Sequence, residues 1–410
     1  MIEPLLLSYP EARRRVLAAA RAMGAVRVDV AEVAGRALRE DVVAPHALPP
    51  FDNSAMDGFA VRAADLVAAS PPTPVTLPVA AVIAAGAAPR RLAAGSAARI
   101  MTGAPLPAGA DAIVAFEDCE SGGPARARFT APAPPGAHVR RAGADVAAGE
   151  RVLAAGRELS AHDLALLVAI GHARVAVGPR PRAAVVSTGD ELLGARDRLR
   201  PGAIRDSNAP MLRALLEDAG CDVVSVGHAG DARGEAVRAI RRALRRADVV
   251  VSIGGVSAGD FDPVKAGLES IPGAELWRVA MRPGRPQAFA AAGGRLFFGL
   301  PGNPASVACV FEALVRPALR RLQGFADVDR ARVRVRAAVP IESREGRTDF
   351  VRVVLEHRDG AWRATPAGAQ VSGHLGPQSR AHALLVVPHD VAAIAAGAPA
   401  TALLLRRPGR

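Results

Sequence analysis

Residues 182–255 alternate between strand-like and helix-like segments, and this alternation limits the possible folds more than any other feature. Three valine-rich runs, RAAVVSTG, DVVSVGHA and DVVVSIGG, are separated by NAPMLRALLEDAG and EAVRAIRRALRRA, whose apolar residues recur at helical spacing. Strands and helices in this order form a parallel sheet covered by helices. We therefore predict an α/β domain over residues 179–326, with a long amphipathic helix from about Asn303 to Leu322 that ends at Gly324.

The pattern changes on both sides of this segment. Residues 51–147 consist of short apolar runs interrupted by Pro and Gly, which is typical of a small β domain. Residues 10–40 show the spacing of short helices, and residues 148–178 return to a helical pattern, so we assign 1–50 plus 148–178 to a helical linker domain. In residues 327–410 the apolar period becomes two, which predicts a separate small β domain.

Two local signals mark the expected ends of elements. In SAHDLALLVAIG, Ser160 is placed to cap the start of a helix and Gly171 to end it. In VRVVLEHRDGAWRAT, Asp359 and Gly360 stand where a tight hairpin turns.

Length and composition exclude several classes of protein. A chain of 410 residues carries roughly three domains, or four if some are small. The three cysteines, Cys119, Cys221 and Cys309, lie far apart without a CxxC pair, which argues against disulfides and structural zinc and fits a reducing cytoplasm. The N-terminus has an acidic residue where a signal peptide is basic, and no apolar run reaches the roughly 18 residues of a membrane span. We expect a soluble cytoplasmic protein without membrane contact.

The chain is basic, with a net charge of +12, and Lys265 is its only lysine. An arginine-rich surface raises the local concentration of anions such as phosphates or oxyanions, although the same arginines can simply cover solvated helix faces. Nucleic-acid binding would require clustered arginines with interleaved aromatic residues, whereas here the arginines are dispersed and only 3% of residues are aromatic. We expect no nucleic-acid partner.

Residues able to carry chemistry follow the predicted strands in STGDEL, GGVSAGDFDPVK and LPGNPAS. Ligands bind at the carboxyl ends of parallel strands, where helix N-termini offer free backbone donors. Glycines let these amides approach an anion, and carboxylates can hold a divalent ion that bridges to phosphate. The candidates are Ser187, Thr188, Gly189, Asp190, Glu191, Gly254, Gly255, Ser257, Gly259, Asp260, Asp262, Lys265, Gly302, Asn303 and Ser306.

Each of these loops also has a purely structural interpretation, as a turn, a helix cap or a set of salt bridges to arginine. A Walker A loop is excluded because the single lysine follows Val264. Gly255 to Gly259 spell GxSxG, but Asp262 and Pro263 place the helix start too late for a hydrolase elbow. No HExxH or His/Cys cluster indicates catalytic zinc.

Seven motifs in order resemble the MoeA family of molybdopterin molybdenumtransferases and the matching domain of gephyrin-type proteins. They are PPFDNSAMDGFAV from Pro49, RIMTGAPLPAGADAIV from Arg99, VRRAGADV from Val139, STGDEL from Ser187, SIGGVSAGDFDPVK from Ser252, WRVAMRPGRP from Trp277 and GLPGNPASV from Gly299. The resemblance covers essentially the whole chain. It implies a multidomain α/β and β fold with a central molybdopterin-binding α/β domain, a β-rich second domain, a linker domain and a small C-terminal β-barrel domain.

The resemblance implies a magnesium-dependent transferase that inserts molybdate into adenylylated molybdopterin, hydrolyses the phosphoanhydride and releases AMP. It also implies a homodimer, with the site between the α/β domain of one subunit and the second domain of the other. Catalytic roles fall on Glu191, Asp57, Thr102, Asp262 and Lys265, and magnesium ligands are expected among Asp190, Glu191, Asp231 and Asp262. Substrate binding falls on Ser187, Thr188, Gly189, Gly254, Gly255, Ser257, Gly259, Arg140, Asp145, Arg278, Arg282, Arg285, Pro301, Gly302 and Asn303.

Two departures from the family pattern stand out. Arg278 and Arg282 occupy positions where related sequences commonly have lysine, which keeps the charge and changes the donor geometry. Gly376 and Pro377 occupy the place of a serine pair. The preceding adenylylation of molybdopterin and a gephyrin-like scaffold remain alternative functions. The molybdopterin adenylyltransferase and molybdoenzyme chaperones are further candidate partners, and the choice between molybdate and tungstate stays open.

Overall fold

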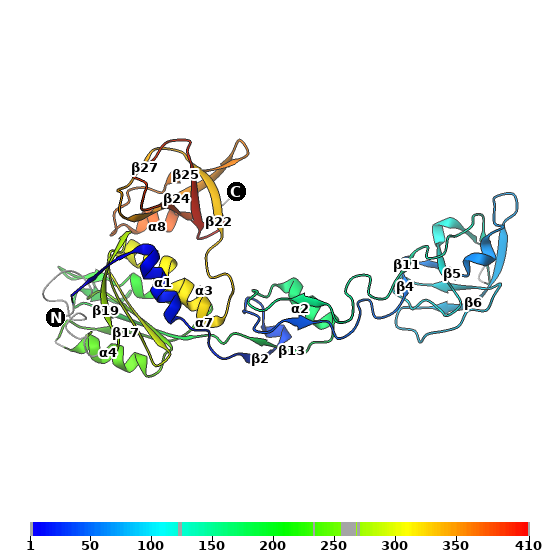
Figure 1. Cartoon of the computed structure of the whole chain (residues 1–410), viewed down its shortest axis with the longest axis horizontal. Coiled ribbons are helices and arrows are strands. Elements are labelled where there is room, and N and C mark those ends of the chain that lie inside the picture. Colours follow the sequence, from blue (N-terminus) through cyan, green and yellow to red (C-terminus); the bar gives the residue numbers. More distant parts are fainter. Residues whose placement is uncertain (1–2, 122–124, 233, 256–267, 269–270, 409–410) are drawn as a thin grey trace.

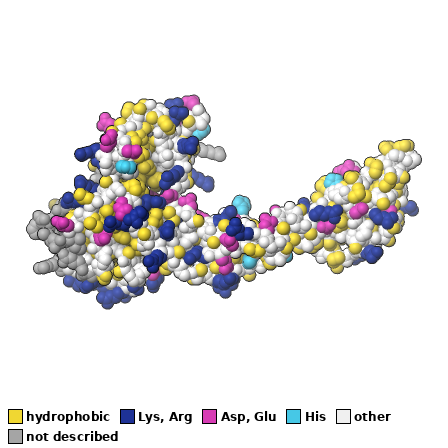
Figure 2. All heavy atoms as spheres, in the orientation of Figure 1, with side chains coloured by type: hydrophobic (Ala, Val, Ile, Leu, Met, Phe, Trp, Pro, Cys, Tyr) yellow, Lys and Arg dark blue, Asp and Glu magenta, His cyan; other side chains and the backbone are white. Residues whose placement is uncertain are grey.

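The computed structural model shows an elongated chain of compact units (Figure 1). The α/β unit and the C-terminal barrel lie at one end, the unit that contains α2 lies in the middle, and the unit that contains β5 and β6 lies at the other end. Arginine side chains are spread along the whole visible face, as the sequence predicts (Figure 2). No helix in the described residues is long and apolar enough to cross a membrane. The structure describes residues 3–121, 125–232, 234–255, 268 and 271–408.

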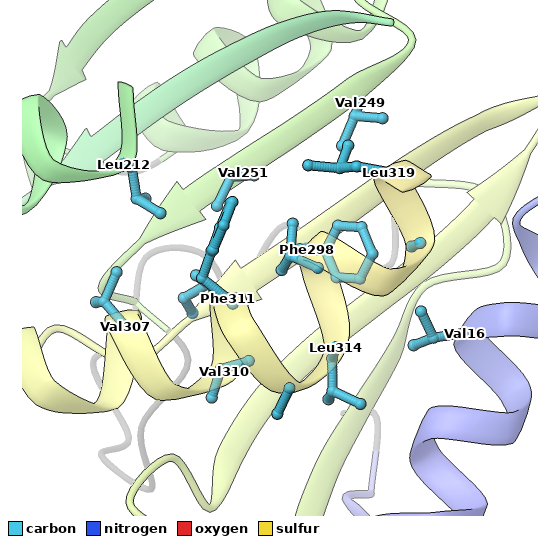
Figure 3. Packing of buried hydrophobic residues seen from close by; sticks show 14 of the residues in the cluster. Val16, Leu212, Val249, Val251, Phe298, Val307, Val310, Phe311, Leu314 and Leu319 are labelled. Carbon is cyan, nitrogen blue, oxygen red and sulfur yellow. The ribbon is translucent and has the colours of Figure 1, made fainter. Parts of the chain in front are cut away.

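The predicted alternation of strands and helices is confirmed. The parallel strands lie in the order β17, β14, β18, β21, with α3 packed on one face of the sheet and α4 on the other. Figure 3 shows Leu212 of α3 near Val251 of β18 in one of these two cores. The elements are β14 (Arg182–Thr188), β15 (Leu192–Leu193), β16 (Ile204–Arg205), α3 (Asn208–Asp218), β17 (Asp222–Ala229), α4 (Glu235–Leu244), β18 (Val249–Ile253), β19 (Glu275–Arg282), β20 (Pro286–Ala292) and β21 (Arg295–Leu300).

The sheet is mixed, however, because β20 pairs antiparallel with β21, and β19 pairs antiparallel with β20. Gly293 and Gly294 both have positive φ and form the whole connection between β20 and β21. A two-residue turn can join only antiparallel strands. The prediction of a parallel sheet is therefore correct for β17, β14, β18 and β21, whereas β20 runs in the opposite direction and β19 again in the first.

The long helix predicted from Asn303 consists of α6 (Pro304–Val310), a π-helical turn η4 (Phe311–Val315) and α7 (Arg316–Gln323). It ends at Gly324, whose φ is 86°. It is not amphipathic, since residues 305–319 are all buried. The sheet covers one side, and α1 and the barrel helix α8 pack on other sides, as Figure 3 shows for α1.

The N-terminal residues correct the predicted domain division. In β1 (Leu5–Ser8) the chain pairs in parallel with β19, and α1 (Tyr9–Ala19) buries Ala12 and Val16 in the core of the α/β unit. Residues 5–19 therefore pack with the α/β unit and not with the linker unit. The expectation of short helices up to residue 40 fails after Ala19, since the chain continues into a strand and a single 3-10 turn.

The linker unit combines one helix with short strand pairs around a core of its own. Ser160 and Asp163 form a capping box at the start of the helix, and Gly171 follows its end with φ 87°, as predicted. The unit contains β2 (Val26–Asp29), η1 (Val30–Glu32), β3 (Val42–Val43), β12 (Arg151–Leu153), α2 (Ala161–Ala169) and β13 (Arg174–Val177).

The second unit is rich in β structure, as expected, and its six-stranded sheet has the order β8, β5, β7, β6, β10, β9. Two apolar clusters fill it, one of them around Phe129. Its elements are β4 (Asn53–Ser54), β5 (Gly58–Val61), η2 (Ala63–Leu66), β6 (Val75–Ile83), β7 (Ala97–Ile100), β8 (Ala112–Ala115), η3 (Phe116–Asp118), β9 (Cys119–Ser121), β10 (Arg126–Phe129) and β11 (Val139–Arg140).

The C-terminal unit is a closed five-stranded barrel in which β24, β25, β22, β28 and β26 pair in a ring. Asp359 and Gly360 form the predicted hairpin turn, with φ values of 53° and 73°. The elements are β22 (Arg332–Ala337), β23 (Ile341–Glu342), β24 (Thr348–Arg358), β25 (Ala361–Pro366), α8 (Leu375–Arg380), β26 (Ala383–Val387), β27 (Ala393–Ile394) and β28 (Pro399–Leu404).

A buried ion pair joins the π-helical turn to the segment that leads into the barrel. The Arg330 guanidinium donates to both oxygens of Glu312, at 2.9 and 3.0 Å, and also to Asp218 at 2.9 Å. The Glu312 side chain is 5% exposed and the Asp218 side chain 58%. Arg316 is also buried, and burial followed by the charge of Arg330 lowers its pKa to about 10.

We expect Glu312→Gln to destabilise the protein by about 3 kcal/mol or more, because Arg330 would keep only the exposed Asp218 as counter-ion and the buried Arg316 would lose the attraction of the nearby Glu312 charge. Asp218→Asn is the matched control, since this exposed carboxylate contacts the same arginine, and its loss should cost less than about 1 kcal/mol. Urea unfolding midpoints measure both changes. Equal effects of the two variants would contradict the role assigned to burial.

Candidate active site

The loops that follow the parallel strands lie together at one edge of the sheet. The Thr188 hydroxyl donates to the Ile253 carbonyl oxygen at 3.0 Å, and the Gly254 N–H donates to the Leu300 carbonyl oxygen at 3.0 Å. The ends of β14, β18 and β21 are thus tied side by side. The strand ends from which the three predicted loops start therefore lie together as expected, and the chemical roles of the loop residues stay predictions.

Two glycines of these loops have positive φ, and side-chain oxygens lie close to them. Gly254 has a φ of 84°, and a Cβ atom there would lie 2.8 Å from Thr188 Oγ1. A Cβ atom at Gly189 would lie 2.2 Å from Glu191 Oε2. The Glu191 carboxylate therefore folds back over the backbone of Gly189. Glycine at these positions lets side-chain oxygens approach the main chain closely.

Asp190 and Asp231 form a reciprocal pair at the same edge. The Asp190 N–H donates to Asp231 Oδ2 at 3.3 Å, and the Asp231 N–H donates to Asp190 Oδ1 at 3.1 Å. The other oxygen of each carboxylate accepts no hydrogen bond from any residue that the structure describes. Each carboxylate thus keeps one oxygen available to a ligand.

Three of the four predicted magnesium ligands lie in the described residues. Within the described ranges no three His, Cys, Asp or Glu side chains form a metal-binding group, so Asp190, Glu191 and Asp231 by themselves make no such cluster. The physical reason is that Glu191 folds over Gly189 while the two aspartates bond each other's backbone. The remaining predictions on this loop edge, Ser257, Gly259, Asp260, Asp262 and Lys265, lie outside the described residues.

A cavity of about 840 Å³ opens beside this edge, between the α/β unit and the barrel. The pairing of Arg282 with Asp349 at the junction of β19 and β24 brings the two units together there. The α/β unit contributes the predicted residues Gly255, Arg282, Arg285, Pro301, Gly302 and Asn303, together with Ser306. The barrel contributes Arg344, Glu345, Gly346, Arg347, Gln370, Val371 and Ser372, which the sequence analysis missed.

The lining of the cavity is positively charged. Four arginines face one glutamate in it, namely Arg282, Arg285, Arg344 and Arg347 against Glu345. Asp349, which is 3% exposed, accepts from Arg347 at 2.8 and 3.1 Å and lies 4.0 Å from Arg282. Asp349 therefore orients two of the arginines, while Arg285 and Arg344 have no acidic partner among the described residues. Such a lining suits a multiply charged anion.

Arg352 shapes the barrel side of the cavity, although it is only 1% exposed. Its guanidinium donates to the carbonyl oxygens of Ala369, Val371 and His374, at 3.0 to 3.2 Å. Burial lowers the pKa of Arg352. It holds the segment from which Gln370 and Ser372 line the cavity. One signal in the sequence was an arginine placed among the apolar residues of VRVVL.

Arg278 and the pair Gly376 and Pro377 lie apart from this lining. Arg278 is exposed on β19, four positions before Arg282, and pairs with Pro286. Gly376 and Pro377 form part of α8. Neither the predicted contact of Arg278 nor an effect of the missing serine pair is visible at the cavity.

The remaining predicted residues belong to the second unit. Asp57 Oδ1 accepts from the Thr102 N–H at 2.7 Å and from the Thr102 hydroxyl at 2.8 Å. These two bonds hold the pKa of Asp57 below its usual value, so the carboxylate is ionised at neutral pH. Arg140 lies on β11 next to Asn53, and the Asp145 N–H donates to Leu48. Within one chain these residues are at the opposite end from the cavity (Figure 1).

Comparison with known proteins covers nearly the whole chain. Residues 7–171 match the family described as MoeA N-terminal region (domain I and II), residues 184–321 match the probable molybdopterin binding domain, and residues 334–405 match the MoeA C-terminal region (domain IV). The chain is 41% identical to molybdopterin molybdenumtransferase 2 of Mycobacterium tuberculosis, over 95% of this chain and 97% of that protein. It is 34% identical to the molybdopterin molybdenumtransferase of Bacillus subtilis, over 90% and 87%. A crystal structure of the molybdopterin biosynthesis MoeA protein of Pyrococcus horikoshii superposes with a TM-score of 0.83 at 31% identity, over 98% of this chain and 100% of that one.

Proposed function

Because the chain belongs to the MoeA family of molybdopterin molybdenumtransferases, we propose that it inserts molybdate into molybdopterin, with adenylylated molybdopterin as the substrate and AMP as the released product. The observation that carries this proposal is the arginine-lined cavity beside the carboxyl ends of β18 and β21, with β14 next to β18 in the sheet. No second function is favoured by a feature of the described residues.

The cavity meets the main physical requirement of this reaction. Molybdate is a dianion, and the phosphoanhydride of the pterin substrate is also negative, so the two repel one another. Fixed guanidinium groups lower this repulsion and orient oxyanions through paired N–H donors. Arg282 and Arg285 would do so from the α/β unit, and Arg344 and Arg347 from the barrel. If the phosphoanhydride is enclosed in this cavity, the arginines would stabilise the negative charge that develops on its oxygens as it is cleaved.

The acidic half of the proposed site lies on the sheet edge. Glu191, which is exposed there, is our candidate to assist proton transfer at the reacting phosphate. Asp190 and Asp231 each keep one oxygen available, and magnesium in such sites commonly takes one or two carboxylates plus substrate phosphate oxygens. These two residues would hold a Mg²⁺ ion, whose charge would polarise the phosphoanhydride.

Asp57 and Thr102 can take part only if another subunit supplies them, because their unit lies at the far end of the chain. We therefore propose a homodimer in which the second unit of each subunit reaches the cavity of the other. An antiparallel pair of elongated chains with twofold symmetry brings opposite ends together. The middle unit, which would lie near the axis, exposes Val168 to 64%.

We expect purified protein to release AMP from adenylyl-molybdopterin when both magnesium and molybdate are present. Chelation of magnesium, omission of molybdate or Asp231→Asn should each reduce the rate by about 10²-fold or more. Asp222→Asn is the matched control and should retain full activity. Asp222 is an exposed carboxylate at the start of β17, whereas Asp231 follows the end of this strand. Consumption of ATP with free molybdopterin, without AMP release from the adenylylated form, would contradict the proposal.

A further inference from the structure

One exposed loop beside the acidic half of the site carries unpaired positive charge. The arginine loop, residues 194–205, contains Arg196, Arg198, Arg200 and Arg205 against a single acidic residue, Asp197. Arg200 donates to the Asp190 carbonyl oxygen at 2.8 Å, and Arg205 donates to carbonyl oxygens within the loop. Arg196 and Arg198 are exposed and make no hydrogen bond or ion pair with any residue of the described segments.

The arginine loop is held in place at the site. Its two ends pair as β15 and β16, the Ile204 N–H donates to the Glu191 carbonyl oxygen at 2.8 Å, and the Asp206 N–H donates to Leu193 at 2.8 Å. The loop therefore cannot move far from Asp190 and Glu191. Its two unpaired guanidinium groups project from the rim of the α/β half of the site.

A matching negative segment lies beside the other half of the site. The acidic segment is Glu117 and Asp118 of η3, both exposed and without an ion pair to any residue that the structure describes. Phe116, the first residue of η3, donates its N–H to the Asp57 carbonyl oxygen at 3.2 Å. Glu120 nearby is already paired with Arg128 at 3.2 Å. Two unpaired carboxylates thus stand next to Asp57, as two unpaired arginines stand next to Asp190.

Two subunits of this chain need local attraction to meet in this way. Each carries a net charge of +12, so two copies repel one another at long range. A contact in which a basic rim faces an acidic rim offsets this repulsion at the place where the shared cleft has to close. Charge complementarity of this kind also fixes the orientation of the partners.

We propose that the arginine loop of one subunit binds the acidic segment of the other, with Arg196 and Arg198 facing Glu117 and Asp118 of the partner subunit. The contact rests on the proposed function, because it presupposes the homodimer with a shared cleft. It sets the position of Asp57 and Thr102 against the cavity. Because the charges are exposed, the contact weakens as the salt concentration rises.

Charge reversal tests this contact. The double variant Arg196→Glu/Arg198→Glu and the double variant Glu117→Arg/Asp118→Arg should each raise the dimer dissociation constant by about tenfold or more, measured by sedimentation at low salt. Each should also raise the KM for adenylyl-molybdopterin. A chain that carries all four changes should recover the wild-type dimer constant and KM, because the charges then match again. Arg242→Glu on α4 together with Arg246→Glu, two residues past its end, is the control with the same change of charge. Thermal unfolding checks the fold of every variant.

The outcomes separate this contact from the function on which it rests. If wild-type protein releases AMP and the two reversals leave the dimer constant unchanged, the contact is wrong and the function stands. If the reversals weaken the dimer but the fourfold variant is no better, the two segments do not face each other, and the contact is overturned. If wild-type protein releases no AMP, the function fails, and recovery of the dimer constant in the fourfold variant still supports the contact.

Discussion

Replacing Arg282 with glutamate is expected to lower kcat/KM for AMP release by a factor on the order of 10³. Arg282 lies in the cavity lining and stands 4.0 Å from the buried Asp349, which holds it toward the barrel. A glutamate there would remove a donor to the oxyanion and place a second negative charge beside Asp349. Both changes raise the free energy of the bound anions. The increase is largest for the transition state, because its negative charge is the most concentrated.

Two further variants give this expectation its controls. Arg282→Lys keeps the charge but loses the paired donors, so it should cost only about tenfold. Arg90→Glu reverses an exposed arginine of the second unit and should leave kcat/KM close to that of the wild type. Steady-state AMP release over a range of substrate concentrations measures all three. An Arg282→Glu protein with near-normal kcat/KM would exclude the cavity as the anion site.

Much of the fold could be predicted because its signals are local. Ser160 caps its helix, Gly324 ends another in the left-handed conformation, and Asp359 with Gly360 forms a hairpin turn. Each of these residues determines the backbone conformation only of residues close to it in sequence. Its effect can therefore be predicted without knowledge of the rest of the chain. The alternation of strands and helices in the α/β unit is predicted for the same reason.

Features that depend on distant contacts could not be predicted in this way. Leu5 of β1 pairs with Trp277 of β19, and no local pattern in the sequence predicts that an N-terminal strand joins this sheet. The helix that begins at Pro304 has the spacing of an amphipathic helix, yet it is buried on all sides because α1 and α8 cover it. The spacing of apolar residues predicts that a segment is helical, but it does not predict how many other elements pack against the helix.

In the candidate site, too, the residues that depend on strand order could be predicted, and those that depend on tertiary contacts could not. Parallel strands end at one edge, so the positions of Thr188, Gly254 and Gly302 near one another followed from the strand order. Arg344 and Arg347 join the cavity only because β24 of the barrel meets β19, which is a tertiary contact. The magnesium ligands were predicted from the carboxylates in the loop motifs, but a motif does not show that the Glu191 side chain folds over Gly189.

In the proposed homodimer, each active site combines the cavity of one subunit with Asp57 and Thr102 of the other. Asp57→Ala and Arg282→Ala homodimers should each be nearly inactive. In a heterodimer of the two variants, one cleft carries both substitutions and the other carries neither. Such a heterodimer should therefore regain about half of the wild-type rate.

The decisive measurement is AMP release by heterodimers purified through two different tags, one on each variant subunit. If the cleft is shared, the rate is close to half that of the wild type and far above that of either parent homodimer. A heterodimer no more active than the Asp57→Ala and Arg282→Ala parents would show that the site is not shared between subunits.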